Sequence, residues 1–263
     1  MKTQVRQILL LVALIFLGAS SMPLQASPLD ADPGGPRMVQ PIKKVAFVID
    51  DFGNDMAGTK EMMDMSIPLT IAVMPFLPTT QRDANWAHEK KHEVLVHLPM
   101  EPVKGKKHWL GPGAITTDLS DEEIRNRVNK AIDDVPFAIG VNNHMGSKAT
   151  ADPRVMSIIL EICKERGLFY LDSRTSPKSV AAVIAQEKGV PYLENSLFLD
   201  DQYTMKHIRK QMELLCKNIN NQRVCIAIGH VGPPGKKTAR VLRDYIDRIK
   251  HEAEIVPLST LIE

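Results

Sequence analysis

The chain has 263 residues, of which 44% are hydrophobic and 24% are charged, so it can bury one large core. A single domain of this size is common among α/β barrels. The formal net charge of +2 gives no support to a nucleic-acid partner or to a strongly acidic one, and we expect no nucleic acid.

The N-terminus has the pattern of a secretory signal peptide. Lys2 and Arg6 precede an apolar run over residues 8–17, and small residues then lead to a cleavage site that ends at Ala26. The pattern predicts a signal peptide over residues 1–26, cleaved after Ala26, and hence a periplasmic or secreted protein. An uncleaved membrane anchor is the alternative, but the run is shorter than the ~20 apolar residues that a span needs.

The next segment, residues 27–42, contains Pro, Gly and Asp without periodicity, which is typical of a flexible linker. We expect one domain over residues 43–263. No other stretch of the sequence is long and apolar enough to span a membrane, so no stable span is expected after cleavage.

The domain opens with residues 45–55, VAFVIDDFGND. The apolar run has no polar alternation, as expected of a parallel strand buried on both faces. It ends at Asp50 and Asp51, before a turn at Gly53. Ligands and catalytic groups of parallel α/β folds gather at this end of the strands. One aspartate could simply cap the following helix, which would leave the other unexplained.

Helical and strand patterns alternate through the rest of the chain. Helices are expected over residues 56–65, 79–91, 120–134, 152–166, 177–188, 203–218 and 236–250. Strands are expected over residues 69–74, 93–96, 137–141, 168–171 and 224–228, with short ones near Tyr192 and Ile255. Regular alternation of this kind implies a parallel sheet with right-handed crossovers. The predicted fold is a single α/β domain, a (β/α)7-type distorted barrel of parallel strands with outer helices.

Carboxylates and imidazoles follow five of the predicted strands. These residues are Asp50 with Asp51, then His97, His144, Asp172 and His230. A barrel brings all of these strand ends to one face, and burying such groups without partners would cost several kcal/mol each. Asp and His together form the ligand set of a zinc-like divalent ion. The sequence therefore predicts a metal site at this face.

Several motifs resemble those of NodB-type polysaccharide deacetylases, and in particular the group of divergent polysaccharide deacetylases. The matching segments are residues 48–53 (VIDDFG), 92–97 (HEVLVH), 97–101 (HLPME), 143–147 (NHMGS), 228–230 (IGH) and 229–233 (GHVGP). The resemblance extends from Lys43 to the C-terminus, and it implies a NodB-like barrel with a bound divalent metal, most naturally Zn²⁺.

The resemblance also implies roles for individual residues. Asp50 would be the general base, Asp51 and His97 would be metal ligands, and His230 would be the general acid. The family motif has a second histidine four residues after its first, where this chain has Glu101. We therefore expect His144 to be the third ligand, with Glu101 as the alternative.

Three further residues are assigned to the substrate. Glu101 would face it if His144 completes the metal site, and Asp172 and Arg174 would orient the base or bind the substrate. The implied activity is metal-dependent hydrolysis of N-acetyl or O-acetyl groups on a cell-envelope polysaccharide, such as peptidoglycan.

Two other functions compete with this one. The first is an inactive barrel that binds a glycan, and the substitution at Glu101 is compatible with it. The second is phosphate handling, because residues 229–238 (GHVGPPGKKT) resemble a phosphate loop. That loop departs from the pattern, since Lys237 follows Gly235-Lys236 and His230 stands where the first glycine belongs.

Overall fold

The computed structural model describes residues 42–105 and 109–262, so the predicted signal peptide and nearly all of the predicted linker lie outside the described residues. The strands are β1 (Lys44–Phe52), β2 (Thr70–Val73), β3 (Glu93–Met100), β4 (Ala138–Met145), β5 (Phe169–Asp172), β6 (Tyr192–Glu194), β7 (Leu197–Phe198), β8 (Val224–His230) and β9 (Glu254–Ile255). The helices are α1 (Thr59–Met63), α2 (Thr80–Glu89), α3 (Asp121–Asp134), α4 (Pro153–Glu165), α5 (Ala181–Lys188), α6 (Met205–Asn221) and α7 (Gly235–Glu252), with 3-10 turns η2 (Ala149–Ala151) and η3 (Leu258–Leu261).

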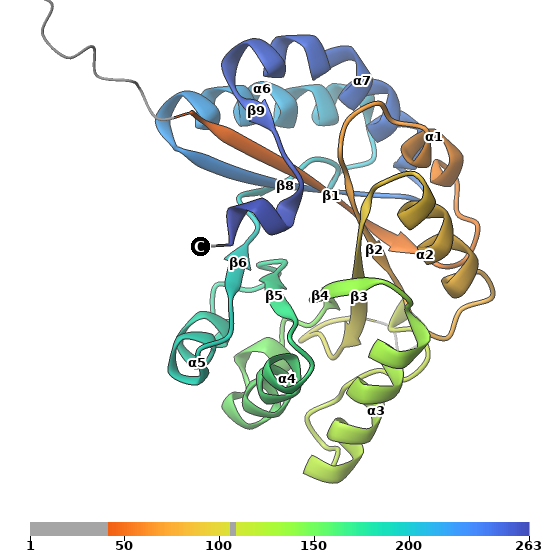
Figure 1. Cartoon of the computed structure of the whole chain (residues 1–263), viewed down its shortest axis with the longest axis vertical. Helices are drawn as coiled ribbons and strands as arrows, with labels where there is room; N and C mark the ends of the chain where they lie inside the picture. Colours follow the sequence, from red (N-terminus) through yellow and green to blue (C-terminus); the bar gives the residue numbers. More distant parts are fainter. Residues whose placement is uncertain (1–41, 106–108, 263) are drawn as a thin grey trace, which may run out of the picture. The chain divides into compact units, whose positions relative to one another are not determined.

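The strands form one parallel sheet in the order β6-β5-β4-β3-β2-β1-β8-β7, and β9 pairs with β1 off this path. The sheet curves into a half-barrel with helices on its outside (Figure 1). The predicted fold class is therefore confirmed. The sequence patterns did not predict β7, which has only two residues, so His230 ends β8 rather than a seventh strand.

Side chains of each strand alternate between two core layers. Val45, Phe47 and Ile49 of β1 belong to the large cluster under the helices, whereas Ala46 and Val48 belong to a smaller cluster on the inner face. Both sets are buried, which explains why the run shows no polar alternation. The inner cluster is completed by Leu258 from η3 near the C-terminus.

The helices cover the outer face, and their buried apolar residues belong to the large core cluster. Helices α6 and α7 pack on each other beside β8, while α3, α4 and α5 follow one another around the other side of the sheet (Figure 1). Helix α5 begins four residues later than predicted because Ser176 and Ser179 hydroxyls bond the backbone there, which favours a turn. Within residues 42–105 and 109–262, no helix is long and apolar enough to cross a membrane.

Asn195 and Ser196 connect the two edges of the curved sheet by hydrogen bonds. The backbone N–H of Asn195 donates to the carbonyl of Asp172 on β5, at 2.9 Å. The N–H of Ser196 donates to the carbonyl of Ile226 on β8, at 2.9 Å, and its hydroxyl accepts from the Ile226 N–H at 3.1 Å. The link between β6 and β7 thereby joins both sides of the half-barrel.

Candidate metal centre

The polar site is the continuation of the inner apolar layer toward the carboxyl ends of the strands. On four strands a polar side chain stands two positions after an inner apolar residue, because side chains two apart share a face. These pairs are Val48 and Asp50, Leu95 and His97, Leu171 and Ser173, and Ile228 and His230, whereas on β4 a register shift puts Asn142 three positions after the inner-facing Ile139. Register places Asp50 beside His230 and His97 beside Asn142. The sheet thus assembles a ring of polar groups above an apolar floor.

Asp51 reaches the same site as Asp50 because the strand is irregular at this point. Adjacent residues of a regular strand point to opposite faces, but the β1–β2 register shifts between Ile49 and Phe52 and Asp51 has a left-handed φ of 73°. The Gly53 N–H then donates to the buried carboxylate of Asp83 at 2.9 Å, which fixes the turn. Both predicted carboxylates are therefore presented to one cavity.

Asp51, His97 and His144 bring one ligand atom each to a common point. Asp51 Oδ1 lies 3.3 Å from His97 Nε2 and 3.0 Å from His144 Nδ1, and the two nitrogens are 3.1 Å apart. The three atoms all lie within 4.8 Å of one another, a spacing that could hold a metal ion. The structure thus brings together the three residues that the sequence assigned to the metal.

Hydrogen bonds on the far side of each ring decide which nitrogen carries the proton. The Asn142 amide nitrogen donates to Asp50 Oδ1 at 2.9 Å, so its oxygen faces His97 Nδ1 at 2.8 Å and can only accept. His97 Nδ1 therefore carries a proton. His144 Nε2 lies 3.1 Å from the carbonyl oxygen of Trp109, so it also carries a proton.

The atoms that face one another are consequently electron-rich. In the neutral rings, His97 Nε2 and His144 Nδ1 present lone pairs to the carboxylate oxygen of Asp51, and that buried oxygen has no hydrogen-bond donor among the described residues. Histidine ligands of metals characteristically donate their other N–H to an outer acceptor, as both rings do here. The donor set fits a divalent cation of the zinc type.

Electrostatics favour positive charge at the same point. Burial lowers the pKa of His97, but the carboxylates of Asp50 and Asp51 outweigh it and the net pKa is raised. Burial raises the pKa of Asp51, but His144 and His97, when their rings are protonated on both nitrogens, outweigh it by hydrogen bonding and charge and hold that pKa well below its usual range. Asp51 is therefore ionised, as a metal ligand must be.

Asp50 is the buried carboxylate beside Asp51, His97 and His144. Its side chain accepts from Asn142 and its Oδ2 lies 3.7 Å from His97 Nε2. Burial raises the pKa of Asp50, and the neighbouring His97 and His230 offset part of that rise. A carboxylate with a raised pKa is a better proton acceptor near neutral pH than an exposed one.

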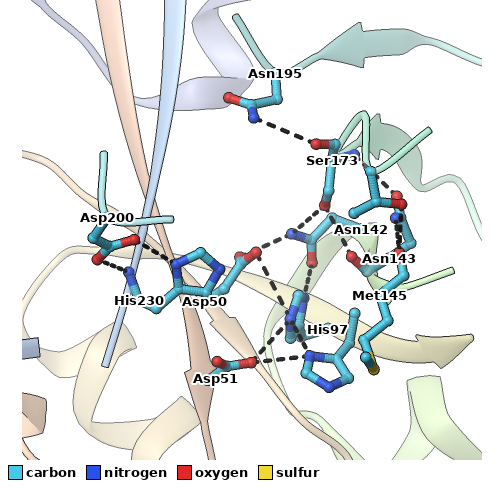
Figure 2. Close-up of polar contacts among 12 residues, drawn as sticks. Asp50, Asp51, His97, Asn142, Asn143, Met145, Ser173, Asn195, Asp200 and His230 are labelled. Carbon is cyan, nitrogen blue, oxygen red and sulfur yellow. Dashed lines mark hydrogen bonds and ion pairs between the residues drawn. The ribbon is translucent and has the colours of Figure 1, made fainter. Parts of the chain in front are cut away.

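His230 on β8 is the register partner of Asp50 on the adjacent strand β1, and a second carboxylate, Asp200, binds it (Figure 2). Its Nδ1 lies 2.7 Å from Asp200 Oδ1, and its backbone N–H donates to Asp200 Oδ2 at 2.9 Å. Thr238 donates to the same Oδ2 at 2.6 Å. Burial would lower the pKa of His230, but Asp200, with Asp51 and Asp50, raises it to about 10. His230 is therefore an imidazolium at neutral pH.

These groups open onto a cavity of about 190 Å³. Its wall contains Asp50, Asp51, His97, His144 and His230, with Asn143, Met145, Ser173, Thr175 and Phe198 completing it. The Phe198 ring stacks on His230 at 5.8 Å between centroids. The cavity thus gathers three residues that could hold a metal ion, a carboxylate with a raised pKa and an imidazolium.

The three residues assigned to the substrate lie outside this wall. Glu101 accepts from the Thr117 backbone N–H and hydroxyl, each at 2.8 Å, and pairs with Lys148 at 2.8 Å. The Glu101 oxygens are thus occupied by Thr117 and Lys148. His144, rather than Glu101, lies with Asp51 and His97 in the group that could hold a metal ion.

Asp172 points away from the cavity because it shares a face with Tyr170 of the outer core, not with Leu171 of the inner one. Its carboxylate accepts from the Arg174 N–H at 2.7 Å and from the Ser179 hydroxyl at 2.5 Å. The Arg174 guanidinium lies 3.7 Å from Glu194 at the end of β6. Both residues therefore hold the loop after β5, and the structure does not place them at the cavity wall.

Two polar partners of the proposed site residues, Asn142 and Asp200, were missed from the sequence. Asn142 lies two positions before His144, on the same face of the strand, and this spacing is the signal that could have identified it. Asp200 follows the two-residue strand β7, which the sequence does not show, so no local pattern pointed to it. A carboxylate partner for His230 could be found only from the fold.

Comparison with known proteins identifies related chains. The family model for divergent polysaccharide deacetylases matches residues 47–262. The uncharacterised protein YibQ of Escherichia coli is 34% identical over 219 residues, which are 83% of this chain and 67% of YibQ.

Two solved structures share the fold. The uncharacterised protein ATU2773 of Agrobacterium tumefaciens matches with a TM-score of 0.78 at 20% identity, over 86% of this chain and 92% of that chain. The Bacillus anthracis protein BA3943, described as a CE4 family pseudoenzyme, matches with a TM-score of 0.51 at 13% identity, over 85% of this chain and 67% of that chain. At these identities the likeness concerns the fold alone.

Proposed function

The chain belongs to the divergent polysaccharide deacetylase family, and on this premise we propose that it is a metal-dependent hydrolase that removes N-acetyl or O-acetyl groups from a cell-envelope polysaccharide. The observation that carries the proposal is the convergence of Asp51 Oδ1, His97 Nε2 and His144 Nδ1 beside Asp50 and His230. If Asp51, His97 and His144 formed only a structural ion pair, neither Asp50 nor His230 would be needed beside them.

The three ligand residues would hold the metal, and Zn²⁺ is the ion that their Asp-His-His chemistry suits best. When bound, such an ion lowers the pKa of water to about 7 and polarises a carbonyl oxygen. The outer hydrogen bonds of His97 and His144 keep their ligand nitrogens deprotonated and aimed at one point.

Asp50 and His230 divide the proton transfers. Asp50 is the carboxylate next to the ligands that is not itself in the ligand set, so it is free to take the proton from the attacking water. His230 is an imidazolium because Asp200 stabilises its charge, so it can donate a proton to the leaving sugar amine or hydroxyl. The proton acceptor, Asp50, and the proton donor, His230, thus have surroundings that suit each to its task, since burial raises the pKa of Asp50 and Asp200 keeps His230 an imidazolium.

We propose an exported location for this activity. The N-terminal sequence supports it, because the charged start, the apolar run and the small-residue site ending at Ala26 form a signal-peptide pattern. An exported polysaccharide hydrolase would meet an envelope glycan such as peptidoglycan. Mass spectrometry of the protein recovered from a bacterial periplasm would detect a chain that begins at Ser27 if cleavage follows Ala26.

One rival function has specific support. An inactive barrel that retains the fold and binds a glycan fits the substitution at Glu101, where the family motif has a second histidine. The rival predicts glycan or metal binding without turnover. A measurement of turnover in a variant that keeps its metal therefore separates the two functions.

The test begins with the metal content of the chain from Ser27, purified without chelator. We expect close to one equivalent of a zinc-like metal in the parent and its loss in His97→Ala and His144→Ala. On N-acetylated glycan substrates, Asp50→Asn should keep its metal and lose about 10²–10⁴-fold in rate, the usual contribution of a general base.

Glu101→Gln is the matched control, since it changes a nearby carboxylate that the structure ties to Thr117 and Lys148. It should bind metal as the parent does. A parent that binds no metal even after zinc is added would refute the hydrolase proposal. A metal-loaded parent with no turnover on any acetylated glycan, beside measurable glycan binding, would establish the inactive barrel instead.

A further inference from the structure

Among the residues that the structure describes, Asn142 is the one side-chain amide that contacts both a proposed metal ligand and the proposed base (Figure 2). It is fully buried on the inner face of β4. Its Oδ1 lies 2.8 Å from His97 Nδ1, and its Nδ2 donates to Asp50 Oδ1 at 2.9 Å. Burying an amide costs desolvation free energy, and an apolar residue of similar shape could fill the same space without that cost. The two hydrogen bonds of this amide therefore point to a role at the site.

We propose that Asn142 is a positioning residue that fixes the proton of His97 on Nδ1, and so its lone pair on Nε2, while holding Asp50 in the orientation from which it accepts a proton. The inference rests on the proposed function. It assigns no chemical step to Asn142, which acts through His97 and Asp50. What it adds is a physical link between metal binding and the orientation of the base.

The direction of each hydrogen bond carries the inference. Ionised Asp50 can only accept, so it fixes which end of the amide faces it, and the carbonyl end must then face His97. That carbonyl can only accept, so Nδ1 of His97 must donate. The lone pair of neutral His97 is thereby placed on Nε2, which faces Asp51 and His144.

An amide is suited to this position in a way that a carboxylate or an apolar side chain is not. Aspartate at 142 would still accept from His97 but would place two carboxylates side by side at Asp50. Leucine has similar volume and would remove both bonds. The two substitutions therefore separate the contact with the ligand from the contact with the base.

Asn142→Leu should bind zinc about 10–100-fold more weakly than the parent, the usual loss when the outer partner of a ligating histidine is removed. Asn142→Asp should bind zinc as tightly as the parent or more tightly, because a carboxylate is a strong acceptor for the His97 N–H. Its turnover should nevertheless fall, because repulsion turns Asp50 away from its orientation. Weaker binding in both variants would instead indicate general disruption of the site and overturn the proposal.

The position of the proton is measured directly on protein labelled with ¹⁵N at histidine only. Long-range ¹H–¹⁵N spectra should show Nδ1 of His97 protonated in the parent, with and without zinc, and in Asn142→Asp. In Asn142→Leu, spectra of the metal-free ring recorded at a pH above its raised pKa should show the other tautomer. A parent ring protonated on Nε2 alone would overturn the proposal even if Asn142→Leu fails to fold.

Asn195→Ala is the control for loss of a buried amide at the same end of the sheet. Asn195 donates to the Ser173 carbonyl at 3.3 Å and contacts neither His97 nor Asp50. Its zinc affinity should equal that of the parent. The metal-free spectra keep this inference distinguishable from the proposed function, because a chain that binds no metal would refute the hydrolase while the location of the His97 proton would still be decided.

Discussion

At the scale of single residues, the pairing of His230 with Asp200 determines the pH range over which His230 stays protonated. The carboxylate raises the pKa of His230 to about 10 against the effect of burial. His230 therefore stays charged throughout the neutral range. The pair stabilises the folded chain fully below the unfolded pKa of about 6.5, and this contribution is lost as pH rises through about 10.

Asp200→Asn should lower the pKa of His230, because the neutral amide no longer stabilises the imidazolium. The alkaline limb of the rate profile should then move to lower pH, since the donor loses its proton earlier. An NMR titration of His230 beside the rate profile measures both effects. Asp201→Asn is the matched control, because Asp201 pairs with His207 instead, at 2.5 Å. Identical profiles for Asp200→Asn and the parent would show that His230 is not the donor.

The sequence predicted which carboxylates and imidazoles follow the strands, but not which of them face the cavity or which side chains they contact. Asp50, Asp51, His97, His144 and His230 follow strands that are recognisable from their apolar runs. Asp172 follows such a strand as well, yet it lies one position out of phase and faces outward. Phase along a strand depends on which face is the interior, and that is known only when the sheet is assembled.

At the scale of elements, the loops that follow β1 and β8 are packed together through glycines. A Cβ on Gly235, at the start of α7, would come within 2.1 Å of the Ala57 carbonyl oxygen, and the Gly232 N–H donates to that same oxygen at 2.8 Å. The glycine-rich stretch that resembled a phosphate loop thus serves a close backbone contact between β1–α1 and β8–α7.

Gly235→Ala should destabilise the chain, although alanine is normally the better helix residue by about 1 kcal/mol. The added methyl group must push the two loops apart, so we expect the free energy of unfolding to fall by about 1–3 kcal/mol in a denaturant titration. Lys236→Ala, at the next and exposed position, should stay within about 0.5 kcal/mol of the parent. Unchanged or greater stability of Gly235→Ala would show that the loops can separate without cost.

At the scale of the whole molecule, a ligand that binds only the folded chain adds to its stability. Zinc at 100 times its dissociation constant should stabilise the parent by about 2.7 kcal/mol. For a domain of this size that is a rise in Tm of about 5–11 °C. Calorimetry should show the rise in the parent and in Glu101→Gln but not in His97→Ala. An equal rise in His97→Ala would locate the zinc elsewhere.

The parallel half-barrel could be predicted because strand and helix patterns alternate along the chain. Its closure could not, because the residues that join β5 to β8 are Asn195 and Ser196, and their hydrogen bonds connect segments far apart in sequence. Short strands such as β7 are also invisible to periodicity, since two residues carry no period. These missing pieces explain why Asp200, which follows β7, was not anticipated.

The two-position step between the apolar floor and the polar ring has a consequence for relatives of this chain. A deletion of Val96, between Leu95 and His97, would turn His97 toward the helices while leaving the histidine and the motifs on the other strands unchanged. A related protein can therefore keep the histidine and the other motifs and have lost its site. In such a protein, the spacing from the last inner-face residue, Leu95 in this chain, to the histidine distinguishes an intact site from a lost one.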